Sequence, residues 1–174
     1  MKLSLAAALV AIVLPWVAGA QAIVADTGPR APVRQTTECV VTRIVDGDTV
    51  VCAGTGTVRL IGIDTPESNQ PPFGAAATAG LASMLPVGTR ARLERDVEAR
   101  DQYDRALGYL WIGSTQVNWL MVRLGWAVML TYPPNVQYVE HFRSSEQKAR
   151  AERRGLWAID GFACLPVERR RGRC

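Results

Sequence analysis

The chain has 174 residues, which is enough for one globular domain of ordinary size with short appended segments. Hydrophobic residues make up 48% of the chain and charged residues 21%, and this balance excludes an intrinsically disordered protein. The formal charge of +4 permits binding to polyanions but is too small to identify a partner.

The first twenty residues have the pattern of a secretory signal peptide. Lys2 gives a positive start, residues 3–17 are almost entirely apolar, and small residues at 18–20 suit cleavage by a signal peptidase. The apolar run is shorter than the roughly 20 residues of a membrane-spanning helix, so we expect cleavage rather than anchoring. We therefore expect a secreted or periplasmic protein with no membrane attachment after cleavage of residues 1–20, and a flexible linker over 21–37.

A β-meander opens the domain that follows. Residues 39–45, 49–52 and 57–63 have strand composition, and they are separated by turn signals at Asp46-Gly47 and at 53–56. Further along, helices are expected at 75–85, 117–124 and 139–154, and strands at 90–96 and 106–112. Short strands interrupted by helices indicate an α+β domain over 38–158 built on a small barrel, with a basic C-terminal tail at 159–174.

The four cysteines are an even number in a chain with an export signal, which favours disulfide bonds. Four cysteines allow three pairings. We favour Cys39–Cys52 and Cys164–Cys174, because the two members of each pair are close in sequence and far from the other pair. A metal site is the less favoured alternative, since the spacings lack the usual Cys-x-x-Cys form.

Two carboxylates and an arginine converge if the second and third strands pair as a hairpin. A two-residue turn at either 53–54 or 54–55 puts Asp48 and Arg59 on the same face of the sheet. Asp64 leaves the third strand at the same end of this hairpin. Two carboxylates with backbone oxygens suit a hard divalent cation, and an arginine suits a phosphate oxygen. Glu67 is near enough to orient or deprotonate a water, so the set predicts phosphodiester hydrolysis.

Each motif has a simpler interpretation when it is taken alone. Asp46-Gly47 by itself indicates only a hairpin turn, and Asp64-Thr65-Pro66-Glu67 by itself could begin a helix. The combination, with Arg59 between the two motifs, is much more specific for a catalytic site than either part.

The same motifs resemble the thermonuclease family, whose best-known member is staphylococcal nuclease. The resemblance covers about residues 38 to 158 and implies a five-stranded OB-type β-barrel with three helices. The motifs that carry it, in chain order, are Asp46-Gly47-Asp48-Thr49-Val50, Val58-Arg59-Leu60, Asp64-Thr65-Pro66-Glu67, Asp101-Gln102-Tyr103-Asp104-Arg105-Ala106-Leu107-Gly108-Tyr109 and Gly155-Leu156-Trp157.

The resemblance implies a Ca²⁺-dependent nuclease that hydrolyses DNA and RNA and leaves 3′-phosphate ends. Asp48, Asp64 and the backbone carbonyl of Thr65 would bind the Ca²⁺ ion. Glu67 would position or activate the attacking water.

The resemblance also implies how the substrate is held. Arg59 and Arg105 would hold the phosphate and stabilise the transition state, Tyr103 would contact the phosphate nearby, and Tyr132 would help to hold the base. We expect a monomer. The alternative function is a noncatalytic nucleic-acid-binding module on the same barrel, but such modules lose members of the catalytic set, and this chain keeps them.

Among the departures from the family pattern, two concern the phosphate site. Asp104 stands where family members usually have glycine, which puts a negative charge beside the phosphate site. Gln102 stands where the family has a phosphate-contacting lysine. Both differences are expected to alter affinity and rate more than reaction type.

Overall fold

The computed structural model describes residues 27–32 and 36–174. The secretory signal expected at 1–20 lies outside the described residues, as does part of the expected linker. Within the described part of the chain, no helix combines the length and the apolar character needed to cross a membrane.

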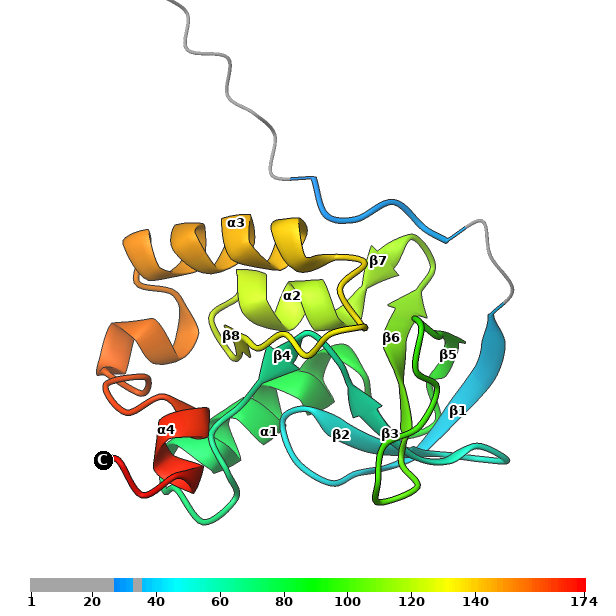
Figure 1. The fold of residues 1–174 in the computed structure, drawn as a ribbon, viewed down its shortest axis with the longest axis horizontal. Helices are drawn as coiled ribbons and strands as arrows, with labels where there is room; N and C mark the ends of the chain where they lie inside the picture. Colours follow the sequence, from blue (N-terminus) through cyan, green and yellow to red (C-terminus); the bar gives the residue numbers. More distant parts are fainter. Residues whose placement is uncertain (1–26, 33–35) are drawn as a thin grey trace, which may run out of the picture.

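Five strands close into a barrel (Figure 1). β1 pairs antiparallel with both β2 and β5, and β5 pairs antiparallel with β6. A parallel pairing of β3 with β6 closes the ring, so the α+β, OB-type architecture expected from the sequence is confirmed. The five barrel strands are β1 (Thr37–Ile44), β2 (Thr49–Cys52), β3 (Gly56–Leu60), β5 (Arg90–Glu94) and β6 (Ala106–Ile112).

Shorter elements extend this ring. β7 (Thr115–Gln116) adds to β6, while β4 (Ile63–Asp64) and β8 (Val128–Met129) form a separate two-stranded sheet. The strand expected over 57–63 is therefore interrupted, because the chain turns at Gly62, whose φ of 79° is left-handed.

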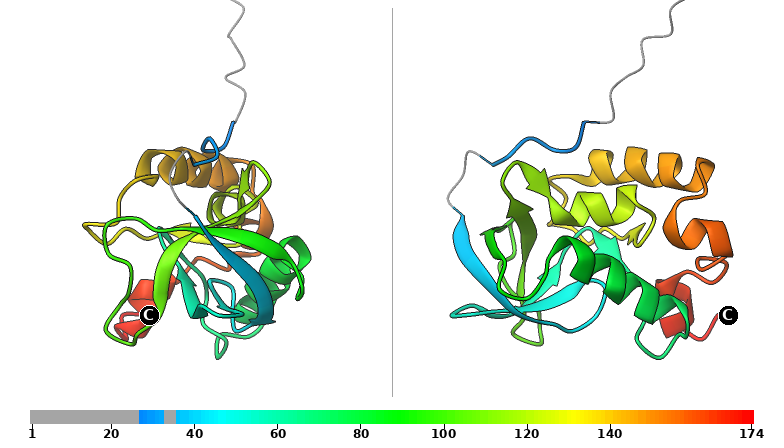
Figure 2. Two further views of the ribbon diagram at one scale, coloured as in Figure 1. Left: turned by 90° about the vertical axis from the view of Figure 1, so that its right-hand side faces the viewer. Right: turned by 180° about the vertical axis from the view of Figure 1, so that it is seen from behind.

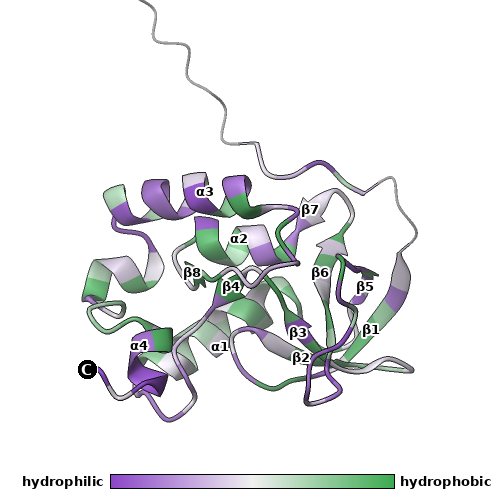
Figure 3. Cartoon of the chain, viewed as in Figure 1, coloured by the Kyte–Doolittle hydropathy of each residue, from purple (hydrophilic) through white to green (hydrophobic). Residues whose placement is uncertain are grey.

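The three expected helices are present, and α3 lies over α2 on the side away from the barrel (Figures 1 and 2). Figure 3 shows α3 as mainly hydrophilic, and the residues it buries are Phe142, Ser145 and Ala149. The three helices are α1 (Phe73–Met84), α2 (Val117–Arg123) and α3 (Val139–Ala151). Two helical segments follow them, a 3₁₀-helix η1 (Gly155–Ile159) and a short helix α4 (Pro166–Arg170) within the segment expected as a basic tail.

The β2–β3 hairpin corrects the register that we predicted. Thr49 pairs with Arg59 and Cys52 pairs with Gly56, which leaves a three-residue turn at 53–55. Both two-residue turns were therefore wrong. Gly54 and Gly56 have positive φ angles of 75° and 84°, and these left-handed conformations make the three-residue turn possible.

The structure contains two disulfides, Cys39–Cys52 and Cys164–Cys174, which is the pairing favoured by the sequence. The first joins β1 to β2 inside the core, where Cys39 is 0% and Cys52 is 2% exposed. The second joins the two ends of the C-terminal segment, and Cys174 is exposed. No cysteine remains free for a metal site among the described residues.

Candidate active site

A cavity of about 790 Å³ opens where the β1–β2 turn, β3, β4 and the loop 98–105 meet. Its lining carries six carboxyl and four guanidinium groups, so the cavity has a surplus of negative charge that a cation would offset. The lining includes all the active-site residues predicted from the sequence, namely Asp48, Arg59, Asp64, Thr65, Glu67, Tyr103, Arg105 and Tyr132.

Asp48 lies in the turn that precedes β2, and hydrogen bonds fix it there. Its backbone N–H donates to Asp46 Oδ1 at 3.0 Å. Its Oδ2 accepts from the backbone N and from Oγ1 of Thr65, both at 3.0 Å. The turn comes so close to Thr65 that a Cβ at Gly47 would meet Oγ1 at 2.8 Å, so only glycine fits at that position. These contacts bring the two aspartate motifs together across 17 residues of sequence.

Asp64 is 1% exposed in β4, which pairs it with Val128 of β8. Burial raises the pKa of its carboxyl group, although Arg170 and Arg59 act in the opposite direction. Burial, together with the nearby Asp48 carboxylate, also raises the pKa of Asp46. Carboxylates that are costly to ionise in the metal-free protein would be stabilised by a bound cation.

Arg59 projects from β3 toward both aspartates. Its Nη2 lies 3.1 Å from Asp48 Oδ2 and 3.5 Å from Asp64 Oδ1. The same nitrogen donates to the carbonyl of Ile63 at 3.0 Å, and Nη1 donates to the carbonyl of Leu60. With its side chain only 15% exposed, this guanidinium is held in one position from several directions. In the observed register, Thr49 and not Asp48 pairs with Arg59, so the shared sheet face that we predicted for Asp48 and Arg59 is wrong. Arg59 reaches Asp48 because Asp48 lies in the turn before β2.

The donor set at these aspartates fits a hard cation. Asp48 and Asp64 offer carboxylate oxygens beside the backbone of Thr65, and the cavity lining formed by the described residues contains no histidine or cysteine, which suits the oxygen ligands that Ca²⁺ prefers. Over residues 27–32 and 36–174, no three His, Cys, Asp or Glu side chains converge as a ready-made metal cage. A cation bound here would therefore complete its shell with carbonyl and water oxygens.

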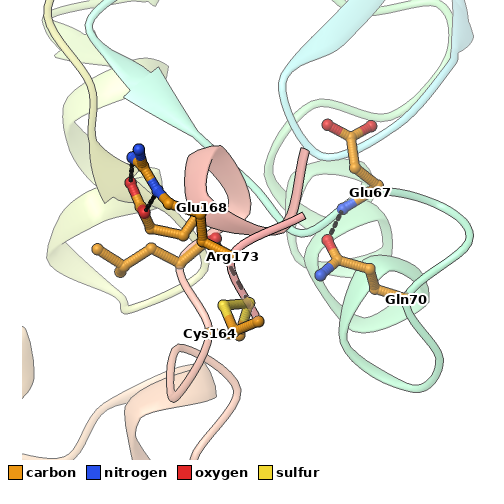
Figure 4. Close-up of a disulfide and its surroundings, with 7 residues drawn as sticks. Glu67, Gln70, Cys164, Glu168 and Arg173 are labelled. Carbon is orange, nitrogen blue, oxygen red and sulfur yellow. Dashed lines mark hydrogen bonds and ion pairs between the residues drawn. A yellow bond between two sulfur atoms is a disulfide. The ribbon is translucent and has the colours of Figure 1, made fainter. Parts of the chain in front are cut away.

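Glu67 lies in the loop between β4 and α1. Its backbone N–H donates to Gln70 Oε1 at 2.6 Å, and Figure 4 shows its carboxylate pointing away from Gln70. A Cβ at Gly74 would lie 2.0 Å from the carbonyl oxygen of Glu67, so glycine allows α1 to begin directly against this loop. The Glu67 side chain is 40% exposed, which leaves its carboxylate accessible to water.

The carboxylate of Asp101, in the same loop, holds Arg105 in position. Asp101 Oδ1 accepts the backbone N–H groups of Tyr103 and Arg105, each at 3.0 Å, and Oδ2 accepts Arg105 Nε at 2.7 Å. Burial alone would raise the pKa of Asp101, but these hydrogen bonds outweigh burial and lower it. The guanidinium of Arg105 also lies 5.5 Å from the centre of the Tyr103 ring. The loop therefore presents Arg105 and Tyr103 together.

Asp104 adopts a φ of 60°, in the left-handed region that glycine occupies without strain. Its carboxylate lies 3.1 Å from Arg100 Nη1 and is not part of the cavity lining. The negative charge that we expected beside the phosphate site is thus paired with Arg100, which lines the cavity. The glycine that the family resemblance implies at this position would suit this backbone conformation.

The two tyrosines stand at the rim, where Tyr103 is 71% and Tyr132 is 63% exposed. Asn135 connects their loops. Its Oδ1 accepts from the N–H of Glu98 at 2.8 Å, and its Nδ2 donates to the carbonyl of Glu98 at 3.2 Å. Both rings are therefore available to contact a bound ligand.

Arg170 is a charged residue of the cavity that was not predicted from the sequence. Arg170 of α4 donates from Nη2 to Asp64 Oδ2 at 2.8 Å and from Nη1 to Glu67 Oε1 at 2.5 Å. Burial alone would lower the pKa of Arg170, but the hydrogen bonds with the two carboxylates outweigh burial and raise it. The sequence signal that could have located Arg170 is the pair of cysteines around it, Cys164 and Cys174, which turns an arginine-rich tail into a closed ring.

Comparison with known protein families matches residues 57–159 to the family described as Staphylococcal nuclease homologue. The match begins in β3 and ends with η1. It therefore includes Arg59, Asp64 and Arg105 and stops before Arg170.

Individual relatives agree with the family match. A thermonuclease of Staphylococcus intermedius is 36% identical over 125 residues, which are 67% of this chain and 74% of that protein. The endonuclease YncB of Bacillus subtilis (strain 168) is 32% identical over 130 residues, which are 69% of this chain and 61% of that protein. The SPbeta prophage-derived endonuclease YokF of the same organism is 34% identical over 130 residues, 69% of this chain and 44% of that protein.

Proposed function

The chain belongs to the staphylococcal nuclease family and is a nuclease, and we propose that it is a secreted, calcium-dependent member that cleaves both DNA and RNA. One observation carries this proposal. Asp48, Arg59 and the pair Asp64 and Glu67 come from three segments of the chain and meet in one cavity of about 790 Å³.

In this proposal Asp48, Asp64 and the carbonyl of Thr65 hold the ion. When bound, Ca²⁺ would neutralise charge on the phosphate and make the phosphorus easier to attack. The buried carboxylates of Asp48 and Asp64 supply the negative charge that the ion requires. The 3.0 Å hydrogen bonds from Thr65 to Asp48 also keep these two ligands in place before the ion binds.

The two arginines act on the phosphate. Arg59 and Arg105 lie on different walls of the cavity, and together they would bind the phosphate oxygens and stabilise the charge that develops on them. Glu67 would accept a proton from the attacking water. The water oxygen bonds to phosphorus as the bond from phosphorus to the 5′-oxygen breaks, and the departing 5′-oxygen takes a proton from solvent, which leaves a 3′-phosphate and a free 5′-hydroxyl.

The exposed tyrosines would act on the rest of the substrate. Tyr103 would contact the phosphate beside Arg105, and Tyr132 would stack with or hold a base at the rim. Contacts to a phosphate and to the face of any base carry little sequence information, so the proposal is for broad specificity over DNA and RNA.

The deciding experiment is digestion of labelled single-stranded DNA and RNA by the purified chain, with excess Ca²⁺ or with chelator. We expect cleavage of both polymers only with Ca²⁺, and product ends that accept a new nucleotide only after phosphatase treatment. Asp48→Asn should abolish cleavage, whereas the matched surface change Glu140→Gln on α3 should leave it intact.

Each part of the proposal can fail separately. Equal cleavage in chelator would overturn the calcium dependence, and cleavage of one polymer alone would overturn the dual specificity. Products that accept a nucleotide without phosphatase treatment would overturn the 3′-phosphate assignment.

Secretion is proposed on two supporting features. Residues 1–20 have the composition of a signal peptide, and two disulfides suit an oxidising compartment outside the cytosol. We propose that the mature chain is a monomer with a linker to residue 37 and a nuclease domain over 38–158. Mass measurement of the protein recovered from medium and periplasm tests secretion with cleavage, because a retained signal peptide would overturn that part of the proposal.

A further inference from the structure

The last eleven residues form an ordered arm beside the cavity. We call residues 164–174 the C-terminal arm. The disulfide Cys164–Cys174 closes it into a ring that contains α4, and Figure 1 places α4 next to the loop that leads into α1. A helix of five residues is too short to be stable alone, so the ring and its tertiary contacts must hold it.

Internal contacts hold the arm in shape. Glu168 accepts two hydrogen bonds from the guanidinium of Arg173, one of them 2.6 Å from Nη2 to Oε1, and Figure 4 shows this pair next to the disulfide. The backbone N–H of Arg173 donates to the Glu168 carbonyl at 3.0 Å. Pro166 is buried against the domain. The arm therefore presents its remaining side chains in a fixed direction.

Arg170 is the side chain that this arm places in the cavity. Its Nη2 lies 2.8 Å from Asp64 Oδ2, and its Nη1 lies 2.5 Å from Glu67 Oε1. One guanidinium thus joins the proposed cation ligand to the proposed base. The neighbouring Arg169 is exposed and does not line the cavity.

This contact occupies a carboxylate oxygen of Asp64, the residue proposed to bind the cation. Arg59 Nη2 lies 3.5 Å from Oδ1 of Asp64, and Arg170 covers Oδ2, so guanidinium groups flank both oxygens of a carboxylate that is 1% exposed. A divalent ion on Asp64 would lie within a few ångströms of the Arg170 charge. Like charges at that distance in a partly buried site repel strongly and are weakly screened by salt.

We propose that Arg170 is a further residue of the active site, which the disulfide-closed arm holds on Asp64 and Glu67 so that it competes with the divalent cation. The inference rests on the proposed calcium site. Cation binding requires Arg170 to withdraw from Asp64, and the arm thereby sets the calcium concentration at which the enzyme is loaded. The segment that matches the family ends at residue 159, so the arm adds this property to the family domain.

The test is calorimetric titration of the metal-free full mature chain with Ca²⁺ alone. Arg170→Gln should bind Ca²⁺ about tenfold more tightly than the unchanged chain, because a competing positive charge is removed. Arg169→Gln is the matched control, since it removes the same charge one residue away, and its affinity should stay within about twofold. The double change Cys164→Ser with Cys174→Ser should shift the affinity in the same direction as Arg170→Gln.

The direction in which Arg170→Gln changes calcium affinity distinguishes a competing role for Arg170 from a structural one. If Arg170 served only to support the structure of the site, its removal would weaken calcium binding. Unchanged or weaker binding by Arg170→Gln, while the unchanged chain binds Ca²⁺, would overturn this inference and leave the proposed function standing. A lack of calcium binding by both proteins would overturn the calcium proposal itself, and this inference with it.

Discussion

The cavity has two walls that are built in different ways. The barrel wall consists of Asp48, Arg59 and Asp64, which are buried or nearly so and are joined to one another. The loop wall consists of Tyr103 and Arg105, which extend from an exposed loop. Groups on the barrel wall are part of the folded core, so changes there should affect stability and catalysis together. Groups on the loop wall should affect catalysis alone.

The largest effect is expected for Arg59→Gln. Loss of this guanidinium should lower kcat on single-stranded DNA by on the order of 10²–10³-fold, as for other groups that stabilise transition-state charge. It should also lower the free energy of unfolding by about 3 kcal/mol, because the buried Asp48 and Asp64 lose a partner. Urea denaturation and steady-state kinetics measure the two quantities. An inactive variant of unchanged stability would contradict the claim that this wall is part of the core.

Arg105→Gln tests the other wall. We expect kcat to fall by on the order of 10²-fold, since the same kind of phosphate contact is lost. The free energy of unfolding should change by less than about 1 kcal/mol, because its ion pair with Asp101 is local and partly exposed. The same two measurements apply, and a stability loss equal to that of Arg59→Gln would remove the contrast between the walls.

A pair of changes at Asp104 tests why the loop has its shape. Asp104→Gly should raise the free energy of unfolding by about 0.5 kcal/mol, since glycine adopts the observed φ of 60° without strain. Asp104→Ala removes the same carboxylate but keeps Cβ, and it should lower stability by about 1 kcal/mol. Thermal unfolding of the two variants gives the comparison. Equal effects would attribute the role of Asp104 to its charge and not to its backbone.

The smallest effect is a difference in proton binding between Asp64 of the barrel wall and Asp101, which binds Arg105 of the loop wall. Burial raises the pKa of Asp64 above the ordinary 3.8, whereas hydrogen bonds from Arg105 outweigh burial and lower the pKa of Asp101. As pH falls, Asp64 should therefore take up its proton before Asp101. Asp64 contributes stability that is present at low pH and lost as pH rises through its folded pKa. Asp101 contributes stability that is present above pH 3.8 and lost as pH falls through its folded pKa.

Carboxyl NMR titration of the metal-free protein measures both midpoints directly. Titration of the two groups in the reverse order would contradict this assignment. Arg105→Gln provides the control, because it should raise the midpoint of Asp101 and leave that of Asp64 unchanged.

Much of the fold followed from the sequence, because its strands and helices carry strong local signals. Residues 49–52 and 106–112 are strands with the predicted bounds, and the closed barrel follows the pattern of short strands broken by helices. The grouping of Asp48, Arg59 and Asp64 was also predicted, but for a partly mistaken reason. The register of the hairpin depends on one extra turn residue, and alternation along the strands does not reveal that residue.

Other parts of the site depend on contacts between distant segments. Arg105 was expected only from the family resemblance, since its position is set by the carboxylate of Asp101 within an irregular loop. Arg170 was not expected in the site at all, because 103 residues separate it from Glu67 and no periodic pattern connects them. Contacts of this kind become visible only once the chain is folded.

The parallel pairing of β3 with β6 has a consequence for local opening of the protein. β3 is hydrogen-bonded on one side to β2 and on the other to β6, so the strand that carries Arg59 has no free edge. Its amide hydrogens should exchange with solvent only when the whole barrel unfolds. The amides of residues 101–105 should exchange through local fluctuations. Hydrogen exchange would then be slow in the strand that carries Arg59 and fast in the loop that carries Arg105, on the opposite wall of the same cavity.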